Sequence, residues 1–155
     1  MSNPAARLQA LGITLPAPVA AVANYVPYVL QEDMLVISGQ ITIENGEKKF
    51  IGRLGENMSL EDGQKAARLC AINIIAQISA ALNGNLDRVA RIIRLGVFVN
   101  ATPGFTDQSL VANGASDLMV KIFGDAGRHA RAAVGVSSLP GGVAVEVEAT
   151  IAVKA

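Results

Sequence analysis

Residues 128–148, which read RHARAAVGVSSLPGGVAVEVE, decide the fold. On both sides of a Pro-Gly-Gly break, valines alternate with small or polar residues, and this period of two is typical of β-strands. Residues 134–137 and 143–148 therefore predict two strands, and the short loop between them favours a hairpin. Arg131 stands at the start of the first strand and Glu146 inside the second. A hairpin register would bring these two side chains to one end of the sheet.

Arg131 can be interpreted in two ways. Its guanidinium is a planar fork of donors that matches a carboxylate. The fork either forms a structural ion pair with Glu146 or anchors the carboxylate of a small acid, and a charge-assisted bond of this kind is worth about 1.5–3 kcal/mol. Glu146 is correspondingly either a strand residue facing solvent or a functional acid. These residues alone leave both alternatives open.

The first 22 residues predict a short helix followed by an extended strap. Asn3 can cap a helix over residues 3–12, and Pro4 suits its first position. Two closely spaced prolines then push the residues before them away from helical conformations. We expect the segment over residues 1–22 to lie across the body of a single domain formed by residues 23–155.

The remaining chain alternates between strand and helix signals. Gly39 marks a bulge in a strand, and Asn45-Gly46 marks a hairpin turn. Ser59 and Asp62 resemble a capping box and open the longest helix. The order of elements predicts an α+β fold in which a mostly antiparallel sheet carries two main helices on one face. The expected elements are strands over 24–31, 34–43 and 50–54, a helix over 59–82, a strand over 89–99 and a helix over 107–123.

Composition narrows the class of protein. A chain of 155 residues predicts one domain with a real core, and 51% hydrophobic against 17% charged residues predicts surface buried against other subunits. The apolar runs are too short to span a bilayer and no signal peptide opens the chain, so we expect a cytoplasmic protein without membrane contact. The single cysteine, Cys70, fits a reducing compartment and is expected to be a buried, inert thiol. A formal net charge of zero disfavours nucleic acid as a partner.

Three blocks of the chain resemble the RidA/YjgF family, in the order that the family shows. Arg131 lies in an Ala-Arg-small-x-Val core that is followed by Leu-Pro and by Val-x-Val-Glu-Val-Glu-Ala, which resembles the C-terminal signature. Tyr25 and the strand that ends in Ser-Gly-Gln at residues 38–40 resemble the N-terminal block, and residues 94–100 resemble the central strand. The resemblance covers residues 23–153 and fits a longer-chain subgroup. It implies a chorismate-mutase-like fold and a homotrimer with ligand clefts between subunits.

The resemblance also implies roles for single residues. Arg131 matches the arginine that binds the substrate carboxylate, and Glu146 matches the acid that positions a water molecule. Tyr25 would line the cleft, although a tyrosine in a strand is more often only a packed aromatic. Gly39 would let the backbone approach the ligand closely, because it has no side chain. The expected substrate-binding set is Arg131, Tyr25, Gly39, Asn113, His129 and Ala133.

Three positions depart from the family pattern. His129 replaces the usual proline two residues before the arginine, Ala133 replaces a small polar residue or cysteine, and Gly135 replaces a frequent glutamate. His129 is either a loop residue without a role or a group that titrates near neutral pH and transfers protons beside the anchor. It is not expected to bind a metal, because the chain holds no second histidine and only one cysteine. No cofactor is expected.

The function that the resemblance implies is an imine/enamine deaminase. Such an enzyme hydrolyses 2-imino acids, or their 2-aminoacrylate-like tautomers, to 2-keto acids and ammonia. The alternative is a non-catalytic trimer that binds or senses a small carboxylate-bearing molecule, and the altered neighbours of Arg131 favour it. Ribonuclease activity, with which some relatives are labelled, is disfavoured by the neutral charge and by the 4% aromatic content.

Overall fold

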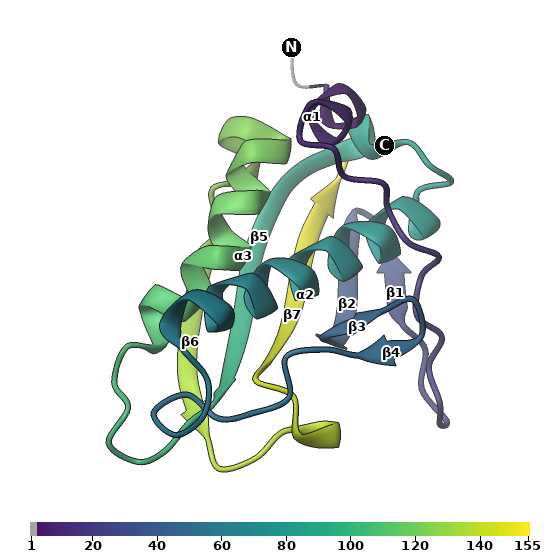
Figure 1. Cartoon of the computed structure of the whole chain (residues 1–155). Helices are drawn as coiled ribbons and strands as arrows, with labels where there is room; N and C mark the ends of the chain where they lie inside the picture. The colour runs from purple at the N-terminus through teal and green to yellow at the C-terminus, as the bar shows by residue number, and fades with distance from the viewer. Residues whose placement is uncertain (1–2) are drawn as a thin grey trace.

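The computed structural model describes residues 3–155, in which a five-stranded sheet carries two long helices on one face (Figure 1). The strands lie in the order β1-β2-β7-β5-β6, and every neighbouring pair is antiparallel except β5 and β6. This confirms the predicted α+β layer. The helices are α1 (Pro4–Ala10), α2 (Leu60–Ala81) and α3 (Gln108–Phe123), and the strands of the sheet are β1 (Tyr28–Gln31), β2 (Met34–Ile41), β5 (Val89–Asn100), β6 (Ala130–Val136) and β7 (Val145–Val153).

The core lies between the sheet and the two long helices. Along β7, buried residues alternate strictly with half-buried ones, because one face of the strand meets the helices and the other does not. α2 packs on β2 and β7 and also against α3, so it is covered on more than one side, as its sequence predicts. Gly114 lies where α3 passes close to α2, since a Cβ there would collide with the backbone of Gln64. The glycine within α3 therefore allows the two helices to pack closely.

Several local signals are confirmed. The Asn3 side chain accepts a hydrogen bond from the amide of Ala6 at 3.0 Å, and the Ser59 hydroxyl accepts one from the amide of Asp62 at 3.1 Å. The pairing of β2 with β7 shifts between Ile37 and Gln40, which is the predicted bulge. The predicted turn at Asn45-Gly46 joins a small separate hairpin made of β3 (Ile43–Glu44) and β4 (Glu47–Lys48).

The predicted pairing of the last two strands is wrong. β6 pairs in parallel with β5, and β7 lies on the other side of β5, between it and β2. The helix α3 connects β5 to β6 as a crossover, and crossover connections produce parallel neighbours. Valines do alternate with small or polar residues in both strands. This alternation shows which residues share a face of each strand, but it does not show which strand lies beside it.

The predicted strand over residues 50–54 is also wrong. This segment makes only isolated bridges, and its backbone leaves the extended region at Phe50 (φ 52°) and at Gly52 (φ 154°). β1 begins at Tyr28 and not at residue 24, because Pro27 cannot donate to the ladder. No helix within residues 3–155 combines the length and the apolar character that crossing a membrane requires.

Candidate functional site

The two principal candidate residues lie on opposite faces of the sheet. Arg131 is level with Leu95 on β5, whereas Glu146 is level with Phe98 on the same strand. Positions three apart on a strand point to opposite faces. Two strand spacings and a three-residue offset separate the two Cα atoms by about 14 Å. The predicted ion pair between Arg131 and Glu146 is therefore wrong, and none is found in the part of the chain that the structure describes.

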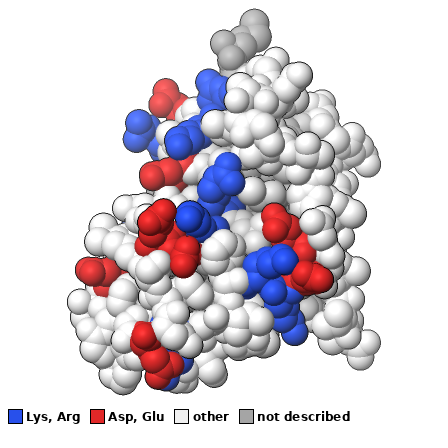
Figure 2. Space-filling model, in the orientation of Figure 1, with Lys and Arg blue, Asp and Glu red and all other residues white. Residues whose placement is uncertain are grey.

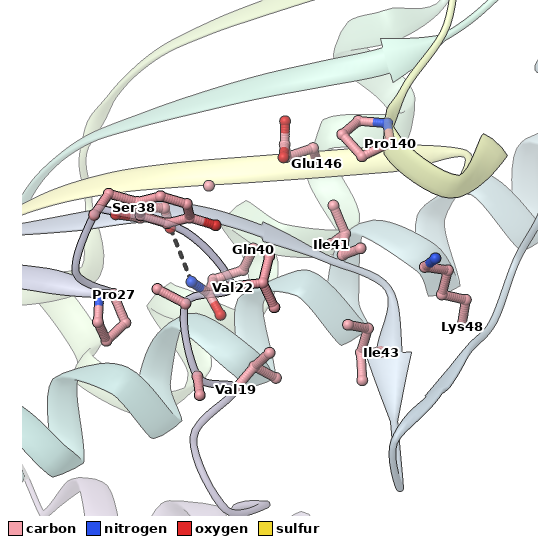
Figure 3. Close-up of a pocket in the computed structure, with 14 residues that line it drawn as sticks. Val19, Val22, Pro27, Ser38, Gln40, Ile41, Ile43, Lys48, Pro140 and Glu146 are labelled. Atoms are coloured by element: carbon pink, nitrogen blue, oxygen red, sulfur yellow. Dashed lines mark hydrogen bonds between the residues drawn. The ribbon is translucent and has the colours of Figure 1, made fainter.

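The Glu146 side chain lies on the face of β7 that the helices leave open, and it lines a pocket of ≈ 320 Å³ (Figure 3). In the structure the strap continues past residue 22 to the start of β1, and its residues 19–27 form one wall of the pocket. The end of β2 with its bulge forms another wall. Tyr25 also lines this pocket, with 54% of its surface exposed. The lining residues are Val19, Ala20, Ala21, Val22, Tyr25, Pro27, Ser38, Gly39, Gln40, Ile41, Ile43, Lys48, Pro140 and Glu146.

Gly39 makes room for the Glu146 carboxylate. A Cβ built on Gly39 would lie 3.0 Å from both Cδ and Oε1 of Glu146, closer than such atoms normally approach. The glycine was expected to let the backbone approach a ligand, and in this structure the nearest group at that position is the side chain of Glu146. Any larger residue at Gly39 would move the carboxylate.

The surroundings of Glu146 favour its protonated form. Burial raises the pKa of its carboxyl, and the negative charge of Glu148 raises this pKa further. Glu148 is itself paired with Arg94 at 3.4 Å, so the repulsion is partly compensated. No hydrogen-bond donor to the Glu146 carboxylate is found within residues 3–155. A half-buried carboxylate with a raised pKa is a better proton acceptor than an ordinary glutamate.

The strap is attached at both ends of the pocket. The Gln77 amide of α2 donates to the carbonyl of Val19 at 2.7 Å, and the Ser38 hydroxyl donates to the carbonyl of Val26 at 2.7 Å. The Gln40 amide donates to the Ser38 carbonyl at 2.9 Å, as Figure 3 shows, and Gln77 in turn reaches Gln40 at 3.4 Å. These amides fix the strap over β2, so the N-terminal segment forms part of the pocket.

Sequence reasoning missed Gln40, Lys48 and Pro140 as lining residues. Lys48 comes from the small hairpin and packs over Gly141, where a Cβ would lie 2.9 Å from its Nζ atom. Gly141 has a φ of 65°, a left-handed conformation that suits glycine. The Leu-Pro-Gly-Gly motif was the available signal, since it bends the chain so that Pro140 borders the pocket.

Arg131 lies on the helix side of β6, where oxygens of α3 hold its guanidinium. Nη1 donates to Asn113 Oδ1 at 2.9 Å and to Ser116 Oγ at 3.1 Å, and Nη2 donates to the carbonyl of Ser109 at 3.3 Å. The structure thus brings Arg131 and Asn113, two residues of the expected substrate-binding set, into direct contact. All three partners are neutral, so within the described residues the charge of the guanidinium is oriented and is not compensated by a carboxylate.

His129 and Ala133 belong to the Arg131 side of the sheet. His129 Nε2 lies 2.8 Å from Ser116 Oγ, and its Nδ1 lies 2.6 Å from the carbonyl of Gly127. Burial lowers the pKa of His129 and the charge of Arg131 lowers it further, whereas the bond to Gly127 acts in the opposite direction. Ala133 is half-buried and follows Arg131 by two residues, on the same face of β6.

Cys70 is fully buried in α2, and its thiol donates to the carbonyl of Val145 at 3.4 Å. Burial raises the pKa of this thiol strongly, so it stays protonated and unreactive, as expected.

Comparison with known proteins gives consistent relatives. Residues 5–145 match the family described as "YjgF/chorismate mutase-like, putative endoribonuclease". The chain is 52% identical over 148 residues to Protein TCP17 of Trypanosoma cruzi, across 95% of this chain and 92% of that protein. It is similar to the structure of Atu1372 from Agrobacterium tumefaciens, a protein of unknown function, with 44% identity, a TM-score of 0.92, and coverage of 97% and 92% of the two chains. The structure of Escherichia coli TdcF with bound serine matches with 28% identity, a TM-score of 0.64, and coverage of 92% and 96%.

Proposed function

The chain belongs to the YjgF/chorismate mutase-like (RidA) family, and on that premise we propose that it hydrolyses reactive 2-imino acids to 2-keto acids and ammonia. The observation that carries the proposal is the state of Arg131. Its guanidinium is oriented by three neutral oxygens of α3, while its Nε–H and one hydrogen of Nη2 have no partner within residues 3–155. Such an edge fits a substrate carboxylate.

Glu146 is proposed as the group that activates water. In the proposed reaction the water oxygen attacks the imine carbon, its proton passes to the Glu146 carboxylate, and the C=N electron pair moves to nitrogen. Glu146 returns this proton to nitrogen, which gives a neutral carbinolamine. The hydroxyl proton of the carbinolamine then passes through Glu146 to nitrogen, the C–N bond breaks, and ammonia leaves as the C=O bond forms. A 2-aminoacrylate-like enamine enters the same path after protonation at its methylene carbon. Tyr25 and the strap would hold the substrate against the carboxylate.

The two halves of the proposed site come from different subunits. Because Arg131 and Glu146 occupy opposite faces of one sheet, a single chain does not present both to one small substrate. The open face of the sheet carries apolar residues that are 39–51% exposed, which supports burial against another copy. These residues are Val29, Met34, Val36 and Val134. We therefore propose a homotrimer in which Arg131 of one subunit approaches the Glu146 pocket of the next.

A second candidate is a trimer that binds a small acid without turnover. The structure of TdcF contains bound serine, which supports a small carboxylate-bearing ligand for this relative of the fold. Ribonuclease activity is a weaker candidate. Acidic and basic groups are intermixed on the face in Figure 2, and the formal net charge is zero, whereas RNA-binding surfaces usually show a continuous basic stripe.

A coupled deamination assay tests the proposed reaction. An L-amino-acid oxidase generates 2-imino acids from a panel of amino acids, and semicarbazide traps the imine that survives. We expect the parent protein to shorten imine lifetime and Glu146→Gln to lose activity by about 100-fold, as removal of a general base does. Glu148→Gln is the matched control on the same strand and should retain activity within a few-fold. If the parent leaves every imine unchanged while pyruvate raises its melting temperature, the binding function replaces the enzyme.

A further inference from the structure

Arg131, Ser116, His129 and Gly127 form one continuous chain of hydrogen bonds. Arg131 Nη1 lies 3.1 Å from Ser116 Oγ, and Ser116 Oγ lies 2.8 Å from His129 Nε2. The other ring nitrogen, Nδ1, lies 2.6 Å from the Gly127 carbonyl. Ser116 belongs to α3, Arg131 belongs to β6, and His129 directly precedes β6. Gly127 ends the 3-10 turn that follows α3. The hydrogen bonds therefore connect α3 to the start of β6 through side chains.

The chemistry of the end groups fixes the direction of every bond. A guanidinium only donates and a backbone carbonyl only accepts. His129 must therefore donate from Nδ1–H to Gly127, which leaves Nε2 as an acceptor in the neutral ring. The Ser116 hydroxyl then donates to Nε2 and turns its lone pairs toward Arg131. A single arrangement of protons satisfies all of these groups.

We propose that His129 and Ser116 are positioning residues that hold the Arg131 guanidinium in the orientation in which it receives a ligand carboxylate. This inference rests on the proposed function of Arg131 as a carboxylate anchor. Asn113 and Ser116 both accept hydrogen bonds from Nη1, and the Ser109 carbonyl accepts one from Nη2. Nε–H has no partner within residues 3–155, and Nη2 keeps one further hydrogen, so both groups can donate to the ligand.

Neutral side chains are better suited than a carboxylate to orient a guanidinium that must bind an anionic ligand. An acid at the position of Ser116 would hold the guanidinium equally well but would neutralise it and compete with the ligand. Ser116 and a neutral His129 orient Arg131 without reducing its charge. His129 lies two residues before Arg131, immediately before β6 begins. Its hydrogen bond to the Gly127 carbonyl therefore also holds the start of β6 in place.

Binding of pyruvate to the full-length protein, measured by isothermal titration calorimetry, tests the proposal without requiring turnover. We expect Ser116→Ala and His129→Leu each to weaken binding about tenfold, the effect of losing one hydrogen bond to a charged group. Because both changes cut the same chain, the double variant should bind no worse than either single variant. His129→Gln offers an amide oxygen to Ser116 and should restore binding to within about threefold of the parent. Arg128→Ala, an exposed neighbour paired only with Asp125, is the control and should bind like the parent.

The outcomes separate this inference from the function on which it rests. If Arg131→Ala binds pyruvate as well as the parent, the anchor itself is wrong. If Arg131→Ala loses binding while Ser116→Ala and His129→Leu keep it, the anchor stands and the positioning role is refuted. If His129→Gln binds as poorly as His129→Leu, the acceptor function of His129 is refuted in favour of a purely structural role. Should His129→Leu fail to fold, Ser116→Ala and His129→Gln decide the question.

Discussion

Subunits that carry Arg131→Ala and subunits that carry Glu146→Gln should restore one another's activity when they assemble together. Each variant alone lacks one half of every site. The two residues occupy opposite faces of the sheet with Cα atoms about 14 Å apart, so no rotamer change within a chain brings both to one small molecule. A mixed interface, however, can combine the intact Arg131 of one subunit with the intact Glu146 of its neighbour.

The size of the recovery follows from the proposed symmetry. A site is intact when its arginine comes from a Glu146→Gln subunit and its glutamate from an Arg131→Ala subunit. With equal amounts of both subunits and random assembly, each condition holds half the time, so about a quarter of all sites should be intact. The expected activity is about a quarter of the parent's, and this fraction is the same for any closed ring in which neighbouring subunits share a site.

The assay compares mixed assemblies with the two variants kept apart. The variants are co-expressed with different affinity tags, purified through both tags in turn, and tested for imine hydrolysis at equal subunit concentration. Purification through both tags enriches mixed rings, so the recovery should then exceed the random fraction. Activity no greater than the sum of the separate variants, in assemblies proven to contain both, would refute a site shared between subunits.

Three substitutions test the surroundings of the site. Gly39→Ala should reduce imine hydrolysis by roughly tenfold with little loss of stability, because the added Cβ moves the Glu146 carboxylate away from its catalytic position. Gly104→Ala is the control, because a Cβ at Gly104 would meet no atom within 4 Å. The raised pKa of Glu146 means that the folded protein holds this proton more tightly than the unfolded chain, so stability falls as the pH rises through the folded-state pKa. Glu146→Gln should therefore raise the melting temperature at pH ~8, and this gain should be lost near pH ~4. An equal gain at both pH values would contradict this cause. Gly114→Ala should lower the free energy of unfolding by about 1–3 kcal/mol in urea denaturation despite the better helix propensity of alanine, because α3 must move away from Gln64; unchanged stability would show that the helices can separate freely.

Local features of the fold could be predicted from the sequence, whereas the partners of the strands could not. Asn3 and Ser59 cap helices through bonds that span only three residues, so their effect is written in the adjacent sequence. The alternation of residues 134–137 and 143–148 also indicates two strands correctly, and the structure places them at Ala130–Val136 and Val145–Val153. Their arrangement depends on β5, which lies between them in space but precedes both in the chain.

The candidate site was also predictable only in part, because local motifs are written in the sequence whereas contacts between distant segments are not. Motif resemblance led to Arg131 and Asn113, which the structure brings within 2.9 Å of each other. Ser116 carried no motif signal, because a serine within a helix usually faces solvent or bonds its own backbone. Its role emerges only when α3 packs beside β6. Gln40 and Lys48 were also missed, because the pocket that they line forms from segments that are distant in sequence.

The lifetime of a 2-imino acid in the presence of Arg131→Ala tests the central claim most directly. Alanine is oxidised in situ by an amino-acid oxidase, and the 2-iminopropanoate that remains is trapped at fixed times with no protein, with the parent, with Arg131→Ala and with Arg128→Ala. The account predicts rapid loss of imine with the parent and with Arg128→Ala, and a lifetime with Arg131→Ala close to that in buffer alone, while the melting temperature and oligomeric state of the variant match the parent. Parent-like acceleration by a folded Arg131→Ala protein would contradict the account.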